Sequence, residues 1–309
     1  MSTIRSLRLV LVPAALCVVL CSLAASLARA GSDFHEVHPA DASGSVEIYD
    51  IADPVEVIGW DRSEVDVTGP PTDGLGSRVQ VTTAGSRTSI RVRPGGGGDA
   101  HLVIRVPAKS SLEATLMSAN LKVSGIFGDA DLRTLSGNIS GEVGGNLWAN
   151  TATGKVQMTA RGARSIEVKT ISGDVQLAGG SGEVEVKTVS GDAKVELATL
   201  SHGRFKTISG NLATSLSLAP DAELEGESVS GNIRFDFPAP PQADFDIESF
   251  SGNIDNCFGP KSVEPRHGPG SRLMFKSGNA QAHVRVVTKS GDIRLCTGPP
   301  SATPSPNHS

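Results

Sequence analysis

Residues 169–197 read KTISGDVQLAGGSGEVEVKTVSGDAKVEL, and within them KTISGDVQL and KTVSGDAKVEL begin 18 residues apart. A Ser-Gly pair followed by Asp or Asn recurs at Ser136, Ser172, Ser190, Ser209, Ser230, Ser251, Ser277 and Ser290, with a relaxed TGKV version at Thr153. From Ser136 through Thr153 to Ser251 the steps are 17, 19, 18, 19, 21 and 21 residues. A nearly constant short period is typical of a solenoid, in which each unit buries its apolar face against its neighbours.

Each repeat is predicted to contain two strands. Around Ser172, Ser181 and Ser190 the Ser-Gly pair comes every nine residues, so one coil holds two strand-and-turn halves. Between the turns, apolar and polar residues alternate, which is the pattern of a strand with one buried and one wet face. The residues expected to face inward are Val184, Val186, Ala193, Val195 and Leu197, and those expected to face outward are Glu183, Glu185, Lys187, Lys194 and Glu196.

The glycines of the motif are predicted to form the turns. A coil this short reverses direction within two or three residues, which requires residues that tolerate positive φ. These structural turn residues are Gly173, Gly191, Gly210, Gly231 and Gly252. The Asp or Asn after each glycine can hydrogen-bond its own turn backbone and is expected to stack coil over coil. The apolar residue before each serine is expected to plug the corner; these residues are Ile171, Val189, Ile208, Val229 and Phe250.

Calcium binding is an alternative interpretation of the Asp and Asn column, because stacked acidic turns bind calcium in Gly-rich nonapeptide β-rolls. The local pattern here is SGDVQLAGG, whereas those rolls use GGxGxDx. Many positions of the column also carry neutral Asn, as at Asn211 and Asn232. Turn capping is therefore the favoured interpretation.

Residues 1–30 are predicted to be a signal peptide. Arg5 and Arg8 precede an apolar run at residues 9–27, and Ala28 and Ala30 supply the small residues of a cleavage site. A membrane anchor is the alternative. No second apolar run of ~18 residues follows, so no membrane span is expected in the mature chain. The protein is thus expected to be exported, either periplasmic or extracellular, with a disordered Pro- and Ser-rich tail at residues 298–309.

The chain is predicted to be all-β, with two parts. Residues 31–110 contain six strand-like segments, which read SVEIYDI, PVEVIGW, SEVDVTG, RVQVTT, TSIRVRP and HLVIRVPA and lack the Ser-Gly repeat. They predict a small antiparallel β domain that caps one end of the solenoid, where an open strand edge would otherwise invite aggregation. Residues 111–297 are predicted to form a parallel β-solenoid with coils of ~18–21 residues.

VIGWDRSEVDV at residues 57–67, IRVPAKSSLEA at 104–114 and the repeated VKT[IV]SGD units together resemble an exported bacterial β-strand-repeat family of candidate adhesins, a domain of unknown function. The resemblance covers most of residues 45–295. It implies a β-solenoid and an envelope or extracellular location, and it brings no catalytic residues with it.

A search for chemistry in the sequence finds no catalytic motif, and we expect no cofactor and no metal site. With a net charge of −5 and an aromatic content of 4%, the sequence has no basic run beside aromatic residues that could bind a nucleic acid. No nucleic-acid partner is therefore expected. His35, Glu36 and His38 are close in sequence, but a flexible terminus is the favoured interpretation over a metal site. A polysaccharide-active β-helix enzyme remains an alternative, although no paired carboxylates beside a cationic cluster are evident.

A stripe of charge is predicted on the outer face, three positions before the repeated serines. It runs from Lys169, Lys187 and Lys206 to Glu227 and Glu248. Such a stripe is usually a solvated face. If it is functional, the three lysines form a possible polyanion-binding stripe, and an acidic glycan or another envelope protein is a possible partner.

Cys257 and Cys296 each follow a repeat serine by six residues, and an oxidising compartment favours a disulfide between them. The steps after Ser251 are irregular, 26 residues to Ser277 and then 13 to Ser290. If Ser277 begins the opposite half of a coil, the cysteines lie in neighbouring strands ~4.8 Å apart, which suits a disulfide. If Ser277 begins a full coil, they are ~9.6 Å apart and cannot join. The first register is favoured because 13 residues are too few for two strands and two turns.

The sequence therefore predicts a non-enzymatic cell-envelope protein that acts as a scaffold or an interaction surface. The alternatives are a surface adhesin that binds glycan or a host surface and, less favoured, the β-helix enzyme.

Overall fold

The computed structural model describes residues 33–50, 52–70, 75–94, 101–263 and 270–298, which all belong to one compact unit. The predicted signal peptide lies outside these residues, as does the predicted disordered tail apart from Gly298. The described part is almost entirely β-strand, and its one helix, α1 (Leu75–Arg78), has four residues. Among the described residues, no helix has the length and apolar character needed to cross a membrane.

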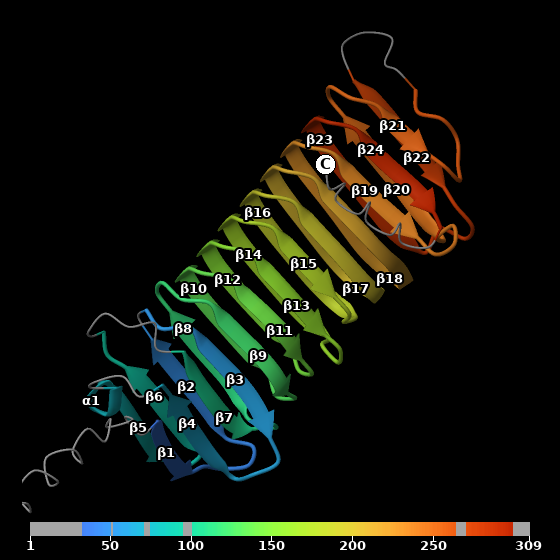
Figure 1. Cartoon of the computed structure of the whole chain (residues 1–309). Coiled ribbons are helices and arrows are strands. Elements are labelled where there is room, and N and C mark those ends of the chain that lie inside the picture. Colours follow the sequence, from blue (N-terminus) through green and yellow to red (C-terminus); the bar gives the residue numbers. More distant parts are fainter. Residues whose placement is uncertain (1–32, 51, 71–74, 95–100, 264–269, 299–309) are drawn as a thin grey trace, which may run out of the picture. The chain divides into compact units, whose positions relative to one another are not determined.

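The solenoid has two faces, and each coil contributes one strand to each (Figure 1). The first face contains β8 (Ser111–Leu116), β10 (Ala130–Ser136), β12 (Leu147–Thr153), β14 (Ser165–Ser172), β16 (Gly182–Ser190) and the C-terminal halves of β17 (Ala193–Ser209) and β18 (Leu212–Ser230). The second face contains β9 (Leu121–Ile126), β11 (Ile139–Val143), β13 (Val156–Ala160), β15 (Val175–Ala178), the N-terminal halves of β17 and β18, and β19 (Ile233–Phe237). All these neighbours are parallel, as predicted.

The register of the coils follows the sequence repeat from Ser136 to Ser230. Thr153 pairs with Ser172, Ser172 with Ser190, and Ser190 with Ser209. The predicted inward residues Val184, Val186, Ala193 and Val195 are buried, whereas Leu197 is only partly buried at the end of its alternating run. Every second residue of each strand therefore points inward, and these apolar side chains form the core between the two faces.

The six strands predicted near the N-terminus are all present. They are β2 (Ser45–Asp50), β3 (Val55–Trp60), β4 (Glu64–Gly69), β5 (Val79–Ala84), β6 (Arg87–Val92) and β7 (Leu102–Pro107), and they are joined by β1 (Phe34–Pro39). The predicted antiparallel arrangement is correct for the pairs β1–β4, β4–β7 and β5–β6.

The antiparallel prediction is wrong for β2 and β3. These strands pair in parallel with β8 and β9, and on their other sides with β6 and β7. They add a coil to the stack although they lack the Ser-Gly motif, because an alternating apolar strand satisfies the same backbone ladder without it.

The predicted turn glycines adopt positive φ, between 133° at Gly191 and 154° at Gly252. A second constraint acts on the same column. A Cβ atom at Gly191 would lie 2.2 Å from the carbonyl oxygen of Gly173, and at Gly210 it would lie 2.1 Å from that of Gly191. Each turn therefore lies directly on the backbone of the turn below it, where only glycine fits.

The Asp and Asn column links successive coils. Asp174 Oδ1 accepts a hydrogen bond from the backbone N–H of Asp192 at 3.0 Å, and Asp192 Oδ1 accepts one from that of Asn211 at 2.8 Å. Asn211 continues the ladder to Asn232 at 3.1 Å. The predicted stacking of this column from coil to coil is confirmed, whereas the predicted bond to the residue's own turn is replaced by a bond to the next turn. Because the acceptor is a side-chain oxygen, neutral Asn serves as well as Asp.

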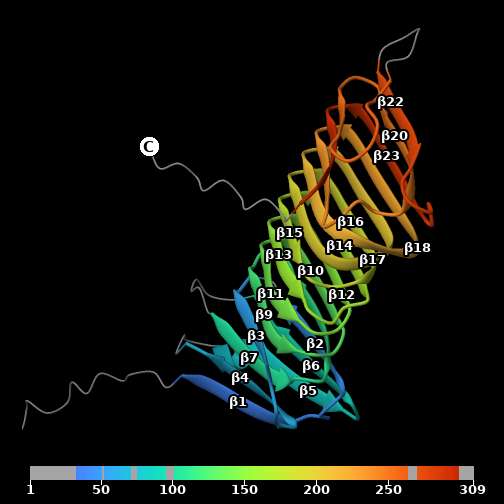
Figure 2. The ribbon, with the colours of Figure 1, turned by 90° about the vertical axis from the view of Figure 1, so that its right-hand side faces the viewer.

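The last coils do not stack in chain order. β20 (Ala243–Ser249) and β21 (Ile254–Asn256) form the outermost coil, and β22 (Ser271–Lys276) runs antiparallel beside β20. β23 (Ala282–Ser290) then inserts between β18 and β20, and β24 (Ile293–Thr297) inserts between β19 and β21. Figure 2 shows β20, β22 and β23 together at one end and β1, β4 and β7 at the other.

This order corrects one prediction and confirms another. Ser277 does not begin half of a coil, because it lies between β22 and β23 and its N–H donates to the carbonyl of Ala243 at 2.9 Å. The coils of Ser251 and Ser290 are adjacent, as predicted, since Ile254 of β21 pairs with Ile293 of β24.

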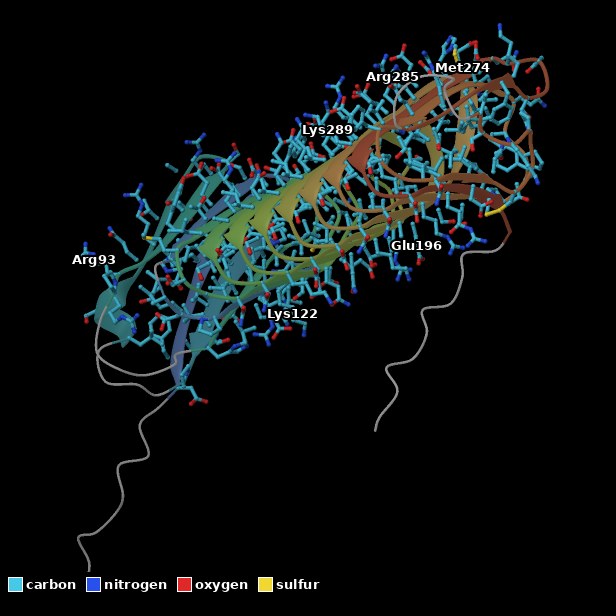
Figure 3. The ribbon with its side chains drawn as sticks, turned by 90° about the horizontal axis from the view of Figure 1, so that it is seen from above. Arg93, Lys122, Glu196, Met274, Arg285 and Lys289 are labelled. Carbon is cyan, nitrogen blue, oxygen red and sulfur yellow. A yellow bond between two sulfur atoms is a disulfide. The ribbon has the colours of Figure 1, made fainter. Side chains whose placement is uncertain are left out.

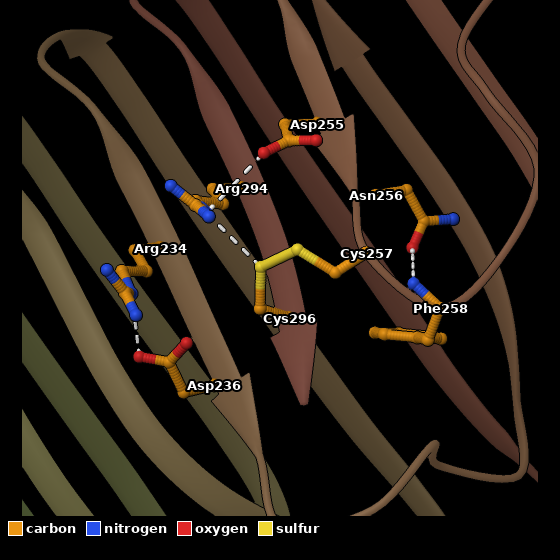
Figure 4. The surroundings of a disulfide bond; sticks show 8 residues. All are labelled: Arg234, Asp236, Asp255, Asn256, Cys257, Phe258, Arg294 and Cys296. Atoms are coloured by element: carbon orange, nitrogen blue, oxygen red, sulfur yellow. Dashed lines mark hydrogen bonds and ion pairs between the residues drawn. A yellow bond between two sulfur atoms is a disulfide. The ribbon is translucent and has the colours of Figure 1, made fainter. Parts of the chain in front are cut away.

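Cys257 and Cys296 form the predicted disulfide (Figure 4), with their Cα atoms 4.8 Å apart. Beside it, the side chain of Arg294 donates a hydrogen bond to Cys296 Sγ at 3.2 Å and pairs with Asp255 at 3.5 Å. The bond ties the outermost coil, which has only three residues in β21, to the coil beneath it.

We predict that Gly191→Ala destabilises the protein by more than about 3 kcal/mol, because it combines a positive φ with a backbone clash. At Gly85, φ is 61° and a Cβ would meet no atom within 4 Å, so Gly85→Ala should cost only about 1–2 kcal/mol. Denaturant unfolding of both variants measures the difference, and equal losses would contradict the stacking of the turns.

Reduction of the disulfide should loosen the outermost coil first, since a disulfide typically contributes ~2–4 kcal/mol. We expect amide hydrogen exchange in β21 to accelerate at least about tenfold, with β14 unchanged as the internal control. A Cys257→Ser and Cys296→Ser double variant should match the reduced protein. Two free thiols per chain, in mature protein purified from an oxidising compartment without reductant, would refute the bond.

Candidate binding face

The three predicted stripe lysines are brought together on the first face. Lys169 pairs in register with Lys187, and Lys187 with Lys206, so they occupy three successive strands. We call them the lysine row. Glu227 follows Lys206 in the next strand, as predicted. Because β23 is inserted, Val287 then separates Glu227 from Glu248, which the sequence had placed next to each other.

Each member of the lysine row has a carboxylate partner in the same chain. Lys169 pairs with Glu167, Lys187 with Glu185, and Lys206 with Glu227 at 2.7 Å. The Glu167 carboxylate raises the pKa of Lys169, and the hydrogen bond from Lys187 is the largest cause of the lowered pKa of Glu185. These shifts favour the charged forms of Lys169 and Glu185, and the paired carboxylates largely neutralise the lysine row.

A second row, made of charged residues and one tryptophan, lies two residues before the lysine row. The register places its members in the order Trp148, Glu167, Glu185, Arg204, Glu225, Arg285 and Asp246. Arg204 pairs with Glu225 at 2.7 Å, and this hydrogen bond is the largest cause of the lowered pKa of Glu225. Among the described residues, Arg285 forms no ion pair.

The residues predicted to plug the corners are exposed instead. Strand alternation continues to the end of each strand, so the preceding residues, such as Thr170 and Thr188, turn inward and are buried. The outward residues form a row that we call the apolar ridge, with 41% to 60% of each side chain exposed: Leu135, Ile171, Val189, Ile208, Val229 and Phe250. Lys289 occupies the equivalent position in β23.

A groove of about 710 Å³ lies between the lysine row and the apolar ridge. Lys187 and Lys206 line one side, Val189 and Ile208 line the other, and Arg285 and Lys289 lie at the end toward β23. Figure 3 shows Arg285 and Lys289 on one side of the solenoid, with Lys122 and Glu196 of the second face on the opposite side. The groove therefore runs across the strands of the first face.

Sequence reasoning missed a second hollow on the same face, also of about 710 Å³. The register stacks Glu183, His202, Glu223 and His283 in successive strands of this hollow. Each of them lies four residues before the position of the lysine row, so the repeat phase could have revealed the column. The insertion of β23, which brings His283 beside Glu223, could not be foreseen from that phase.

The described residues contain one group of three possible metal ligands within 4.8 Å of one another, Asp255, Cys257 and Cys296. Two of these are joined in the disulfide, so they do not form a free metal site. His35 and His38 do not converge on one point either. His35 pairs with Asp66 of β4 at 3.0 Å, and His38 pairs with Glu36 at 3.4 Å.

Solved structures with a similar arrangement include a candidate adhesin from Bacteroides fragilis, with 8% identity and a TM-score of 0.47 over 85% of this chain and 97% of that one. A candidate lipid-binding protein from Parabacteroides distasonis has 15% identity and a TM-score of 0.39 over 86% of this chain and 97% of that one. With these identities and TM-scores, no function is transferred from either protein.

No curated protein matches the sequence. The model of one protein family, described as Toastrack DUF4097, matches residues 55–296, which run from β3 into β24 and include both faces of the solenoid. The chain belongs to the Toastrack DUF4097 family.

Proposed function

We propose that this chain is a non-enzymatic, exported protein of the cell envelope that acts as a β-solenoid scaffold and binds another protein with its first face. The observation that carries the proposal is the apolar ridge, whose central members are exposed on four successive strands: Ile171, Val189, Ile208 and Val229. Contiguous exposed apolar surface rimmed by polar residues marks interaction sites on soluble proteins.

The charges beside the ridge favour a protein partner over a polyanion. An acidic glycan would have to compete with Glu167, Glu185 and Glu227 for the lysine row. A protein surface with both signs of charge can instead match the alternating pattern and cover the ridge at the same time.

The ionisation of the carboxylates argues against a glycosidase. A general acid needs a raised pKa so that it carries a proton near neutral pH. The pKa values of Glu185 and Glu225 are shifted in the opposite direction, by Lys187 and Arg204 respectively. These residues are suited to ion pairing.

Two features support export. Residues 1–30 have the charge, apolar run and small residues of a signal peptide. The disulfide between Cys257 and Cys296 is typical of proteins in oxidising compartments.

An adhesin that binds an acidic glycan is the second candidate, and one observation favours it. In the part of the chain that the structure describes, Arg285 and Lys289 lie at the end of the groove without an ion-pair partner. Unneutralised cations of this kind could hold a sulfate or carboxylate of a glycan.

We predict that a Val189→Asp and Ile208→Asp double variant is lost from the envelope fraction of the source cells, while the wild-type chain is retained. Both side chains are exposed, so the fold should lose less than about 0.5 kcal/mol per substitution. Gln157→Asp with Gln176→Asp is the matched control, because these exposed residues are stacked neighbours on the second face.

Quantitative fractionation, with thermal melts to verify folding, makes the comparison. Equal retention of the ridge variant and the control would overturn the proposal. Salt-sensitive binding of the wild type to acidic glycans, lost on Arg285→Glu with Lys289→Glu or on reversal of all three lysines to Glu, would establish the adhesin instead.

A further inference from the structure

We propose that the partner of the first face is a second copy of this chain. The two first faces pack against each other, and the copies are related by a two-fold axis that lies parallel to the strands, between β17 and β18. The proposal rests on the proposed function, because it names the partner of the same face. The observation that carries it is the order of charges across the face. When this order is reversed in a second copy, several positive side chains meet negative ones.

A two-fold axis along the strand direction reverses the order of the coils but keeps the position along each strand. Each row of side chains therefore meets the same row of the second copy in the opposite order. With the axis between β17 and β18, the strands β12, β14, β16 and β17 face β22, β20, β23 and β18 of the other copy. The first face thus provides four strands on each side of the axis.

Under this two-fold rotation, opposite charges meet away from the axis in the lysine row, in the row two residues before it and in the column of Glu183 and His283. Lys169 faces Glu248, Glu185 faces Arg285, and Glu183 faces His283. In the described part of the chain, neither Arg285 nor Glu248 has an ion-pair partner, and both obtain one in the second copy.

The apolar positions also match. Ile208 faces Val229 at the axis, and Ile171 faces Phe250 further out, which covers much of the apolar ridge. Trp148 faces Met274 of β22, whose side chain is 62% exposed. A contact between an indole ring and a thioether is favourable.

Three facing positions are not complementary. Lys187 faces Val287, but its ammonium group is already paired with Glu185 of its own chain. Glu167 faces Asp246, but each of these carboxylates has a cation in its own chain, Lys169 and Arg272 respectively. The register also sets Val189 against Lys289, whose long aliphatic stem can lie on an apolar surface. A two-fold axis along the lysine row would instead set each lysine against its own copy, which disfavours that arrangement.

The face is large enough for a specific interface. Eight strands at ~4.8 Å and seven residues at ~3.3 Å give about 38 Å by 23 Å, or on the order of 900 Å² per copy. Specific interfaces bury ~800 Å² per partner. Because much of this area is charged and exposed, we expect a reversible dimer with a dissociation constant in the micromolar range.

Sedimentation equilibrium of the mature, disulfide-bonded protein between about 1 and 200 μM tests the proposal. The wild type should dimerise, and Lys169→Glu and Glu248→Lys should each weaken the dimer at least about tenfold, because each creates two like-charge contacts. An equimolar mixture of these two variants should dimerise as the wild type does, since both contacts are then attractive. The Lys169→Glu and Glu248→Lys double variant should also recover.

Lys194→Glu is the matched control, because it removes a comparable lysine–glutamate pair, with Glu196, on the second face. It should leave the dimer unchanged, and thermal melts should verify that every variant is folded. A wild type that is monomeric at all concentrations, or a mixture that does not recover, would overturn the proposal.

The outcomes separate this proposal from the proposed function. If the wild type is monomeric and the Val189→Asp and Ile208→Asp variant still leaves the envelope fraction, only the dimer is refuted. If the wild type dimerises as expected and that variant stays in the envelope fraction, retention in the envelope through the apolar ridge is refuted and the dimer stands.

Discussion

The structure depends on the direct stacking of one backbone turn on the next. The glycine column allows it, because a Cβ at Gly191 or Gly210 would lie about 2 Å from the carbonyl oxygen below. The Asp and Asn side chains then hold each turn to the following one with hydrogen bonds of 2.8 to 3.1 Å. Together these contacts fix the register of every strand that leaves the turn.

A fixed register converts a repeated sequence into rows of side chains on the surface. Lys169, Lys187 and Lys206 are neighbours only because their turns are stacked, and the same holds for the apolar ridge. A row that extends over many strands offers a partner one chemical feature at a regular spacing. The repeat is thus a requirement of the backbone, whereas the binding properties of the face come from the outward positions, which the backbone leaves free to vary.

Much of the fold could be predicted from the sequence, because glycine positions and alternation report directly on backbone geometry. The inward position of Val195 and the pairing of Cys257 with Cys296 followed from them. The insertion of β23 could not be predicted, since Ser251 and Ser290 carry the same motif and either could pair with Ser230. The pairing of the lysines with glutamates was also missed, because it depends on side-chain contacts between strands.

The inserted β23 and β24 have a consequence for the order in which the chain can fold as it emerges N-terminus first. Most coils can close as soon as they are made, since each rests on a coil that precedes it in the sequence. β20 and β21 must wait, because the strands between them and the finished stack are the last ones to be made. The final coil therefore completes only when residues 282–297 are available, so a chain cut short before them would leave β18 and β19 as an open edge prone to association.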